Sequence, residues 1–168
     1  MNYLHSLIIV LSFALISCTS RSDKAAAYND SIIEKQTAVI IAFDKLDASM
    51  TDLDDEGMAA DYLILRGRVK ESIQMLDSLG PFQDDKALLE ASKSLFSGYD
   101  QLMEVEYGEL IKILDASDSV FSVETQQRAY QLQSEIFTKL KHLHADFTEE
   151  QRAFGERYNV IFETEEDK

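Results

Sequence analysis

A short acidic turn holds residues whose types and spacing suit metal chemistry. Asp52, Asp54 and Glu56 alternate along the chain and are followed by Gly57. Oxygen ligands at alternate positions, with a glycine at the sharp bend, are typical of a calcium-binding loop. The residue that should supply the bidentate carboxylate of such a loop is Leu63, however. These three acidic residues are therefore weak candidates for a metal site, and we expect a solvated turn whose carboxylates complement a helix N-terminus.

Three polar residues interrupt stripes that are otherwise apolar, and they are candidates for a buried polar network. They are Gln36, Glu106 and Gln151. Counting the rise of the helices places Gln36 and Gln151 at similar heights, with Tyr28 and Tyr158 below them. An unsatisfied buried amide costs about 1–3 kcal/mol, so the two glutamines are expected to bond each other across the bundle, with a ligand pocket as the alternative. Glu106 falls in another layer, where it either pairs with a tyrosine hydroxyl or has its pKa raised by burial.

The residue patterns of the common enzyme classes are missing from the sequence. His142 and His144 are two residues apart, so on a helix they point in different directions and do not chelate one metal ion. The sequence contains no Glu-x-x-His pair of the di-iron bundles, no glycine-rich phosphate loop and no nucleophile elbow. No catalytic residue is therefore predicted, and the protein is not expected to be an enzyme.

The single cysteine, Cys18, ends an apolar segment. Residues 4–16 are almost all apolar, which suits the core of a signal peptide and is short for a bilayer span. The segment closes with Leu15-Ile16-Ser17-Cys18, which resembles the lipobox of bacterial lipoproteins. This resemblance implies that residues 1–17 are a cleaved signal peptide and that Cys18 carries a covalent lipid. No other cofactor is predicted. An uncleaved membrane helix, or a buried apolar helix with an incidental cysteine, is the alternative, because residues 1–3 contain no Lys or Arg.

The charge of the chain limits its partners. The formal net charge is −15, and residues 1–17 contain none of the Asp, Glu, Lys or Arg residues. An acidic surface repels nucleic acid and anionic lipid headgroups, so no nucleic-acid partner is expected. The expected partners are a membrane, reached through the lipid anchor, and an unidentified protein or envelope component.

Four amphipathic helices must position these residues. Apolar residues recur at three- and four-residue spacing over residues 30–50, 55–79, 85–114 and from about 122 to 158. No segment alternates with a period of two, so no sheet is expected. The predicted fold is all-α: an antiparallel up-down four-helix bundle over residues 28–162, after a flexible tether at 18–27 and before an acidic tail at 163–168. The fourth helix is longer than the first, which predicts an overhang or a break near residues 147–149.

Several short motifs along the predicted helices resemble those of a known family. They are Tyr28-Asn29-Asp30, Pro81-Phe82, Leu95-Phe96-x-x-Tyr99, Glu106-Tyr107-x-Glu109-Leu110 and Gln151-x-x-Phe154-x-x-x-Tyr158-Asn159. Together they resemble a family of bacterial surface lipoproteins from spirochaetes and Bacteroidota whose function is not established. The chain departs from that family at Gly155, where alanine is usual. The resemblance implies a lipid-anchored helical protein of the cell envelope and supplies no catalytic residues.

Two functions remain open at this point. The first is a non-enzymatic interaction module on the outer membrane, facing either the cell surface or the periplasm. The alternative is a carrier or sensor of a small ligand or cation, bound between the helices or at the acidic loops around residues 52–56 and 115–118. Thr19 after the cysteine favours the outer membrane by common sorting patterns. The tether lacks the acidic run of some surface-exported lipoproteins, so both faces of that membrane stay open.

Overall fold

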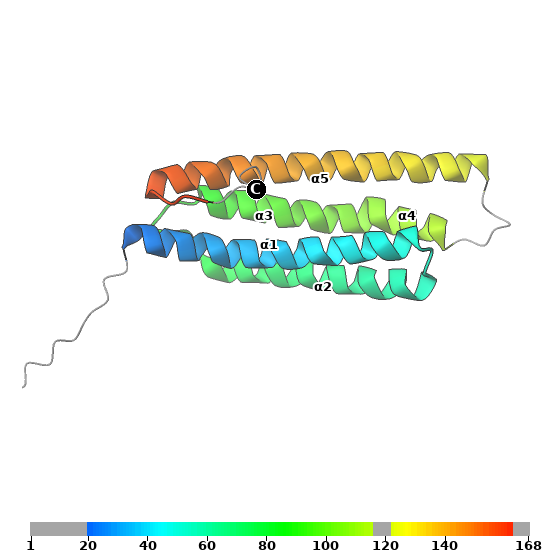
Figure 1. Cartoon of the computed structure of the whole chain (residues 1–168), viewed down its shortest axis with the longest axis horizontal. Helices are drawn as coiled ribbons and strands as arrows, with labels where there is room; N and C mark the ends of the chain where they lie inside the picture. Colours follow the sequence, from blue (N-terminus) through cyan, green and yellow to red (C-terminus); the bar gives the residue numbers. More distant parts are fainter. Residues whose placement is uncertain (1–19, 116–121, 163–168) are drawn as a thin grey trace, which may run out of the picture.

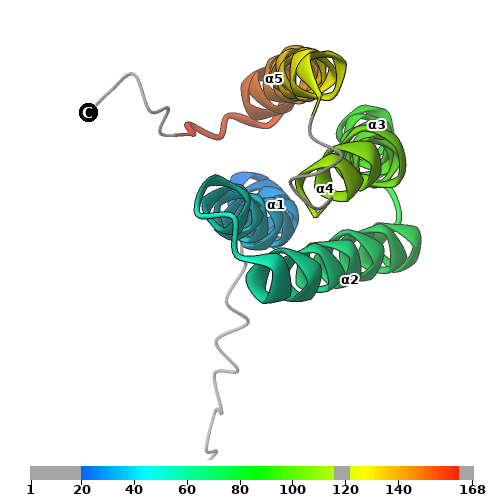
Figure 2. The same cartoon turned by 90° about the vertical axis from the view of Figure 1, so that its right-hand side faces the viewer.

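Helices make up almost all of the residues that the computed structural model describes, which are 20–115 and 122–162. Their order is α1 (Arg21–Thr51), α2 (Asp55–Leu79), α3 (Ala87–Leu102), the π-helix η1 (Met103–Tyr107), α4 (Gly108–Leu114) and α5 (Val123–Tyr158). The segments α3, η1 and α4 follow one another as one rod, so four rods pack side by side (Figures 1 and 2). The predicted all-helical class is confirmed. The lipidation site at Cys18 and the tail at 163–168 lie outside the described residues.

The first helix begins much earlier than the sequence pattern suggests. Ser20 Oγ accepts the Asp23 N–H at 3.0 Å, and Asp23 Oδ2 accepts the Ser20 N–H at 3.0 Å. This reciprocal pair is a capping box, and three alanines follow it, the residue with the highest helix propensity. The predicted flexible tether is therefore wrong from Arg21 onward. Ala25, inside that segment, is fully buried.

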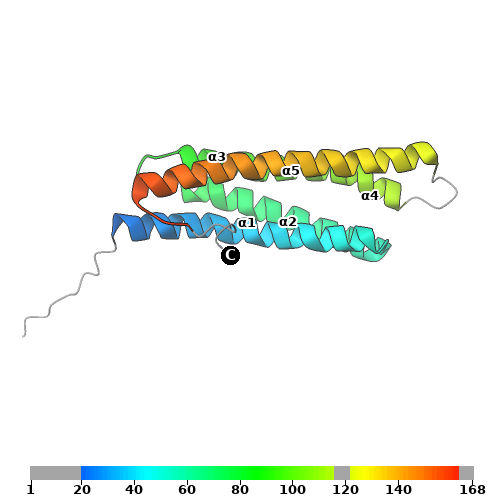
Figure 3. The same ribbon diagram turned by 45° about the horizontal axis from the view of Figure 1, so that its top comes forward.

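An aromatic cluster closes the end of the molecule at which α2 turns into α3. Phe82, from this turn, is buried among Tyr28, Phe154 and Tyr158. Its ring centroid lies 4.9 to 5.6 Å from those of the other three rings. Gly80 has a φ of +68°, which suits a residue without a Cβ and lets the chain leave α2 toward this cluster. The start of α1 and the end of α5 lie at the same end (Figure 3).

The core runs along the whole bundle and takes residues from every rod. Its fully buried members include Ile32, Val39, Leu46, Leu65, Val69, Leu76, Phe96, Tyr99, Leu132 and Phe154. Burying a side chain of this size is worth about 1.5–3 kcal/mol. Apolar burial therefore holds the rods together. None of the helices within residues 20–115 and 122–162 combines the length and the apolar character that crossing a membrane requires.

Two features of the helices differ from a simple periodic pattern. The third rod contains the π-turn η1, which brings Met103, Glu106 and Tyr107 all into buried positions. The Tyr62 hydroxyl donates to the Met103 carbonyl oxygen at 2.9 Å, which gives that carbonyl a partner outside its own helix. The fourth rod, α5, is unbroken, so the predicted alternative of a break near 147–149 is wrong. The first turns of α5 extend past the other rods (Figure 1).

Candidate functional site

Polar side chains line the boundary between α1 and α5 in three successive layers, which we call the α1–α5 seam. In the first layer Gln151 Nε2 donates to Asn29 Oδ1 at 2.9 Å. The predicted pairing of Gln36 with Gln151 is therefore wrong. The seam holds the buried Asn29 as a hydrogen-bond partner that the sequence pattern did not single out.

The two tyrosines predicted to lie under that pair bond to the α2–α3 turn instead. The Tyr28 hydroxyl donates to the Gly80 carbonyl at 2.8 Å, and the Tyr158 hydroxyl donates to Asp85 Oδ2 at 3.2 Å. Burial raises the pKa of Tyr28 to about 12, and the nearby Asp85 carboxylate adds to this shift. These hydroxyls fix the turn that carries Phe82, so they serve the aromatic cluster and not a network with the glutamines.

The middle layer of the seam joins Tyr99, His144 and Gln36. The Tyr99 hydroxyl lies 2.6 Å from His144 Nε2. Burial lowers the pKa of His144 below its ordinary value of 6.5, which keeps the ring neutral at pH 7. Burial also raises the pKa of Tyr99, and a hydrogen bond from Gln36 partly opposes that rise. The Tyr99 hydroxyl thus links His144 on α5 to Gln36 on α1.

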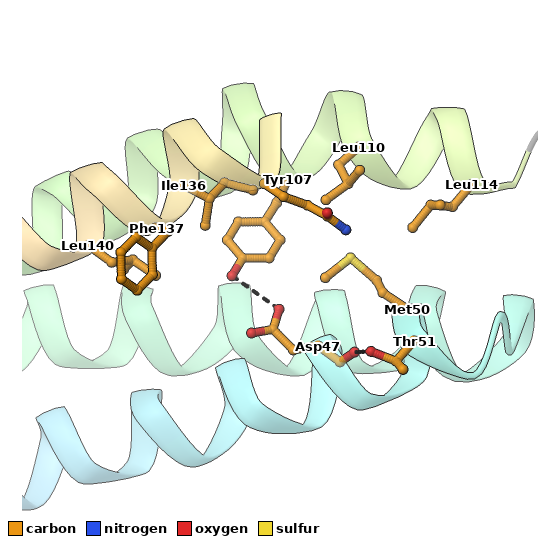
Figure 4. A pocket seen from close by; sticks show the side chains of 10 residues that line it. Asp47, Met50, Thr51, Tyr107, Leu110, Leu114, Ile136, Phe137 and Leu140 are labelled. Atoms are coloured by element: carbon orange, nitrogen blue, oxygen red, sulfur yellow. Dashed lines mark hydrogen bonds between the residues drawn. The ribbon is translucent and has the colours of Figure 1, made fainter. Parts of the chain in front are cut away.

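In the third layer the seam opens into a groove, which we call the Asp47 groove. It encloses about 310 Å³ and is lined by Asp47, Met50, Thr51, Tyr107, Leu110, Leu114, Gln133, Ile136, Phe137 and Leu140. The Tyr107 hydroxyl donates to Asp47 Oδ1 at 3.2 Å across the groove (Figure 4). Partial burial raises the pKa of Asp47, and the neighbouring Asp44 adds to the rise against the opposing Tyr107 bond. The groove is thus an apolar trough with one carboxylate on its wall.

Beside the groove, α5 presents a line of exposed apolar side chains. Val123, Tyr130 and Phe137 are 76%, 65% and 70% exposed and recur every seven residues. Seven-residue spacing keeps side chains on one side of a helix, as in the contact seam of a coiled coil. Phe137 belongs both to this stripe and to the wall of the Asp47 groove. Phe137 is therefore the residue at which the stripe and the groove meet.

A second cavity lies between the third rod and α5, and we call it the Glu106 cavity. It encloses about 230 Å³ and is lined by Gly98, Gln101, Leu102, Glu106, Lys139, His142 and Leu143. Lys139 Nζ donates to Glu106 Oε1 at 2.5 Å, so the predicted tyrosine partner of Glu106 is wrong. Only 5% of the Glu106 side chain is exposed. Its Oε2 atom is buried and has no hydrogen-bond partner among the described residues.

The acidic turn folds as a helix junction. Asp54 Oδ1 accepts the Gly57 N–H at 3.1 Å and so caps α2, while Asp52 follows the last turn of α1. Asp52, Asp54 and Glu56 are all exposed. Within residues 20–115 and 122–162, no three or more His, Cys, Asp or Glu side chains are grouped to hold a metal ion. The loop around Asp118, the other acidic candidate region, lies outside that part of the chain.

Two of the residues missed by sequence reasoning carried a usable signal. Asp47 and His144 both fall on the helical stripes that contain Gln36 and Gln151, at three- and four-residue spacing from apolar neighbours. Following the two stripes over their full length, and not only as far as the two glutamines, would have included both residues. Lys139 gives no such signal, because only the packing of α5 against the third rod brings it to Glu106.

Comparison with known proteins adds no relative: no protein-family model, no curated protein and no solved structure matches this chain.

Proposed function

We propose that the protein is a lipid-anchored component of the bacterial cell envelope whose helical domain is a non-enzymatic interaction module on the outer membrane. The pattern Leu15-Ile16-Ser17-Cys18 supports the anchor. In this proposal the rods form an antiparallel up-down bundle. Two contacts support that arrangement: Ser22 Oγ donates to the Asn159 carbonyl at 3.1 Å, and Tyr28 reaches the α2–α3 turn. The aromatic cluster then lies near the membrane, and the Asp47 groove lies toward the far end.

The observation that carries the interaction proposal is the exposed stripe of α5 beside the Asp47 groove. Monomeric proteins rarely expose a large contiguous apolar patch, and such a patch marks a contact surface. Phe137 joins the exposed stripe to the apolar lining of the groove. The seven-residue spacing of Val123, Tyr130 and Phe137 favours a helix as the partner element. Asp47 and the net charge of −15 favour basic residues beside the apolar face of that helix.

A site-specific crosslinking experiment tests this docking surface. A photo-reactive phenylalanine analogue is placed at position 137 of the full chain, expressed in a bacterial envelope, and irradiated in intact cells. The matched control carries the analogue at Ile41, which is half exposed on α1 and does not line the groove. We expect one crosslinked partner from position 137 only, joined through the apolar face of a helix with basic flanks. The same products from both positions, or none from position 137, would reject the docking proposal.

The anchor has its own test. Radiolabelled palmitate should enter the expressed chain and should not enter a Cys18→Ser variant, which should also leave the membrane fraction. A Cys18→Ser form that stays equally membrane-bound would contradict the anchor. Protease treatment of intact cells then distinguishes the two faces: digestion indicates the cell surface, and protection while a surface marker is cut indicates the periplasm.

A second function, carriage of a small ligand between the helices, is favoured by the Glu106 cavity. A buried carboxylate with one unpaired oxygen, beside a half-exposed lysine on the wall of a cavity, is the kind of polar anchor that small-molecule sites contain. Carriage and docking use different surfaces of α5, so one protein can perform both.

A further inference from the structure

The Glu106 carboxylate is only partly hydrogen-bonded. Oε1 is bonded to Lys139, but Oε2 is buried without a partner among the described residues. A buried oxygen without a hydrogen bond costs about 1–3 kcal/mol, and more on a charged group, so native proteins rarely leave one unpaired. A hydrogen-bond donor at Oε2 would therefore stabilise this arrangement.

The backbone around Glu106 is built to hold it there. η1 is a π-turn, and such turns are rare and occur frequently at functional sites. Tyr62, from α2, bonds the Met103 carbonyl at the start of the turn. Glu106 and Tyr107 are both buried, although they are successive residues and point in different directions. Glu106 consequently faces α5 while Tyr107 reaches the Asp47 groove.

The cavity beside Glu106 has an apolar side and a polar side. Leu102, Leu143 and the backbone at Gly98 supply the apolar side. A Cβ at Gly98 would come within 2.5 Å of Leu143 Cδ2, so glycine at this position keeps α3 and α5 close without displacing Leu143. Gln101, Lys139 and His142 lie on the polar side with Glu106. The volume of about 230 Å³ is below the range of drug-sized sites, which suits a small molecule.

We infer that the Glu106 cavity binds a small zwitterion of the α-amino acid class. A carboxylate oxygen only accepts hydrogen bonds, so the ligand must bring a donor, and an ammonium group gives the strongest bond. Lys139 has three donors, of which the structure uses one on Oε1, and its side chain is half exposed. Oε2 is covered in the free protein, so the half-exposed Lys139 side chain moves aside as the ligand enters. The ligand ammonium then takes Oε2 of Glu106, its carboxylate takes Nζ of Lys139, and its side chain lies on Leu102 and Leu143. This inference rests on the second proposed function, carriage of a small ligand.

Titration calorimetry on the detergent-solubilised full chain tests the assignment with defined probes. Glycine, L-alanine and L-leucine are compared with ethylammonium and acetate, each at millimolar concentration. One site should bind an amino acid at least about tenfold more tightly than either singly charged probe, because only the zwitterion meets both charges. If ethylammonium binds as well as the amino acids, the site takes simple cations and the zwitterion class is wrong.

Three variants locate the binding. Lys139→Met and Glu106→Gln should each weaken amino-acid binding by about tenfold or more. Glu109→Gln is the matched control, because it removes another ion pair between the third rod and α5, that of Glu109 with Arg128, and leaves the cavity intact. Circular dichroism checks the fold of each variant. Glu106→Gln keeps the shape of the side chain without its charge, so it tests the assignment if Lys139→Met, which leaves a buried carboxylate without its lysine, does not fold. Equal binding by wild type and Lys139→Met overturns the inference.

Native mass spectrometry of the protein from its own cells distinguishes the amino-acid ligand class from the proposed function of small-ligand carriage. A small molecule that is bound to the wild type and absent from Lys139→Met upholds carriage, even if every amino-acid probe fails and the ligand class is rejected. No such molecule, together with no binding of any probe, rejects both.

Discussion

His144 makes the seam sensitive to pH at a single residue. In the unfolded chain its pKa is the ordinary 6.5, and burial lowers the pKa in the folded protein. The unfolded state therefore binds a proton first as the pH falls, so the stability contributed by neutral His144 is present above about pH 6.5 and is lost as the pH falls toward the folded pKa. A doubly protonated ring has no acceptor nitrogen, so the charged His144 meets the Tyr99 hydroxyl only as a donor. Urea unfolding should show the wild type losing stability as the pH falls below about 6.5.

The matched variants are His144→Gln and His142→Gln. His144→Gln should flatten the pH dependence, because glutamine does not titrate. His142→Gln should leave it as in the wild type, because His142 is exposed. If both variants show the wild-type slope, His144 is not the group that titrates.

The backbone conformation at Asp84 predicts how a substitution there changes stability. Gln83 and Asp84 have φ values of 49° and 71°, in the left-handed region that side chains with a Cβ disfavour. Asp84→Gly should therefore raise the free energy of unfolding by about 0.5–1 kcal/mol, measured by urea denaturation. Asp84→Ala is the control and should give no such gain, because alanine keeps the Cβ. A loss of stability in Asp84→Gly would show that the aspartate side chain contributes more than its backbone costs.

At the scale of elements, Gly155 lets the chain after α5 fold back onto that helix. A Cβ at Gly155 would lie 2.8 Å from both Phe162 Cε2 and the Val160 carbonyl oxygen. Gly155→Ala should displace Val160 and Phe162 and lower the free energy of unfolding by about 1–3 kcal/mol in urea.

Gly67 provides the matched control for that prediction. It lies inside α2, and a Cβ there would meet nothing within 4 Å. Gly67→Ala should therefore stabilise the protein by about 0.5–1 kcal/mol through helix propensity alone. If Gly155→Ala stabilised the protein as Gly67→Ala should, the contact with Phe162 would not constrain the end of α5.

The helices differ in how much of them the sequence reveals. Apolar periodicity and the Gly80-Pro81 stop predict α2 well, because both ends have clear signals. Periodicity cannot predict the π-turn η1, since the extra residue per turn is settled by contacts such as that of Tyr62 with Met103. The early start of α1 was predictable from the capping box at Ser20 and Asp23 and was missed, because alanines lack an apolar stripe.

At the scale of the whole molecule, the position where α1 begins decides which residues meet across the seam. Asn29 lies about two helical turns after Arg21, and Gln151 lies about two turns before Asn159, which caps α5. Residues at equal distances from the end of the bundle therefore do pair across the seam. Gln36 was predicted as the partner of Gln151, in place of Asn29, because the start of α1 was placed too late. Lys139 and the Glu106 cavity could not be predicted this way, since they depend on the rotation of α5 about its axis.

The four rods also differ in how many buried contacts hold them, which predicts where local unfolding occurs first. The first half of α5 borders the Asp47 groove and carries the exposed stripe, and Arg128 ties it to Glu109 by two bonds of 2.8 and 2.7 Å. α2 instead contributes several fully buried side chains, among them Leu65, Val69 and Leu76. Regions with few buried contacts exchange amide hydrogens through local opening. Amides of residues 123–135 should therefore exchange at least about tenfold faster than those of residues 65–76.

Arg128→Gln separates the ion pair from the groove as the cause of that opening. Arg128 is partly exposed, and exposed ion pairs contribute little, so this variant should speed exchange in residues 123–135 only slightly and leave α2 unchanged. A partner seated on Phe137 should slow exchange in the same segment, because docking buries the stripe. Equal protection of α2 and the start of α5 in the free protein would mean that the groove does not loosen α5. The docking surface would then be rigid before its partner arrives, and binding would leave exchange in residues 123–135 unchanged.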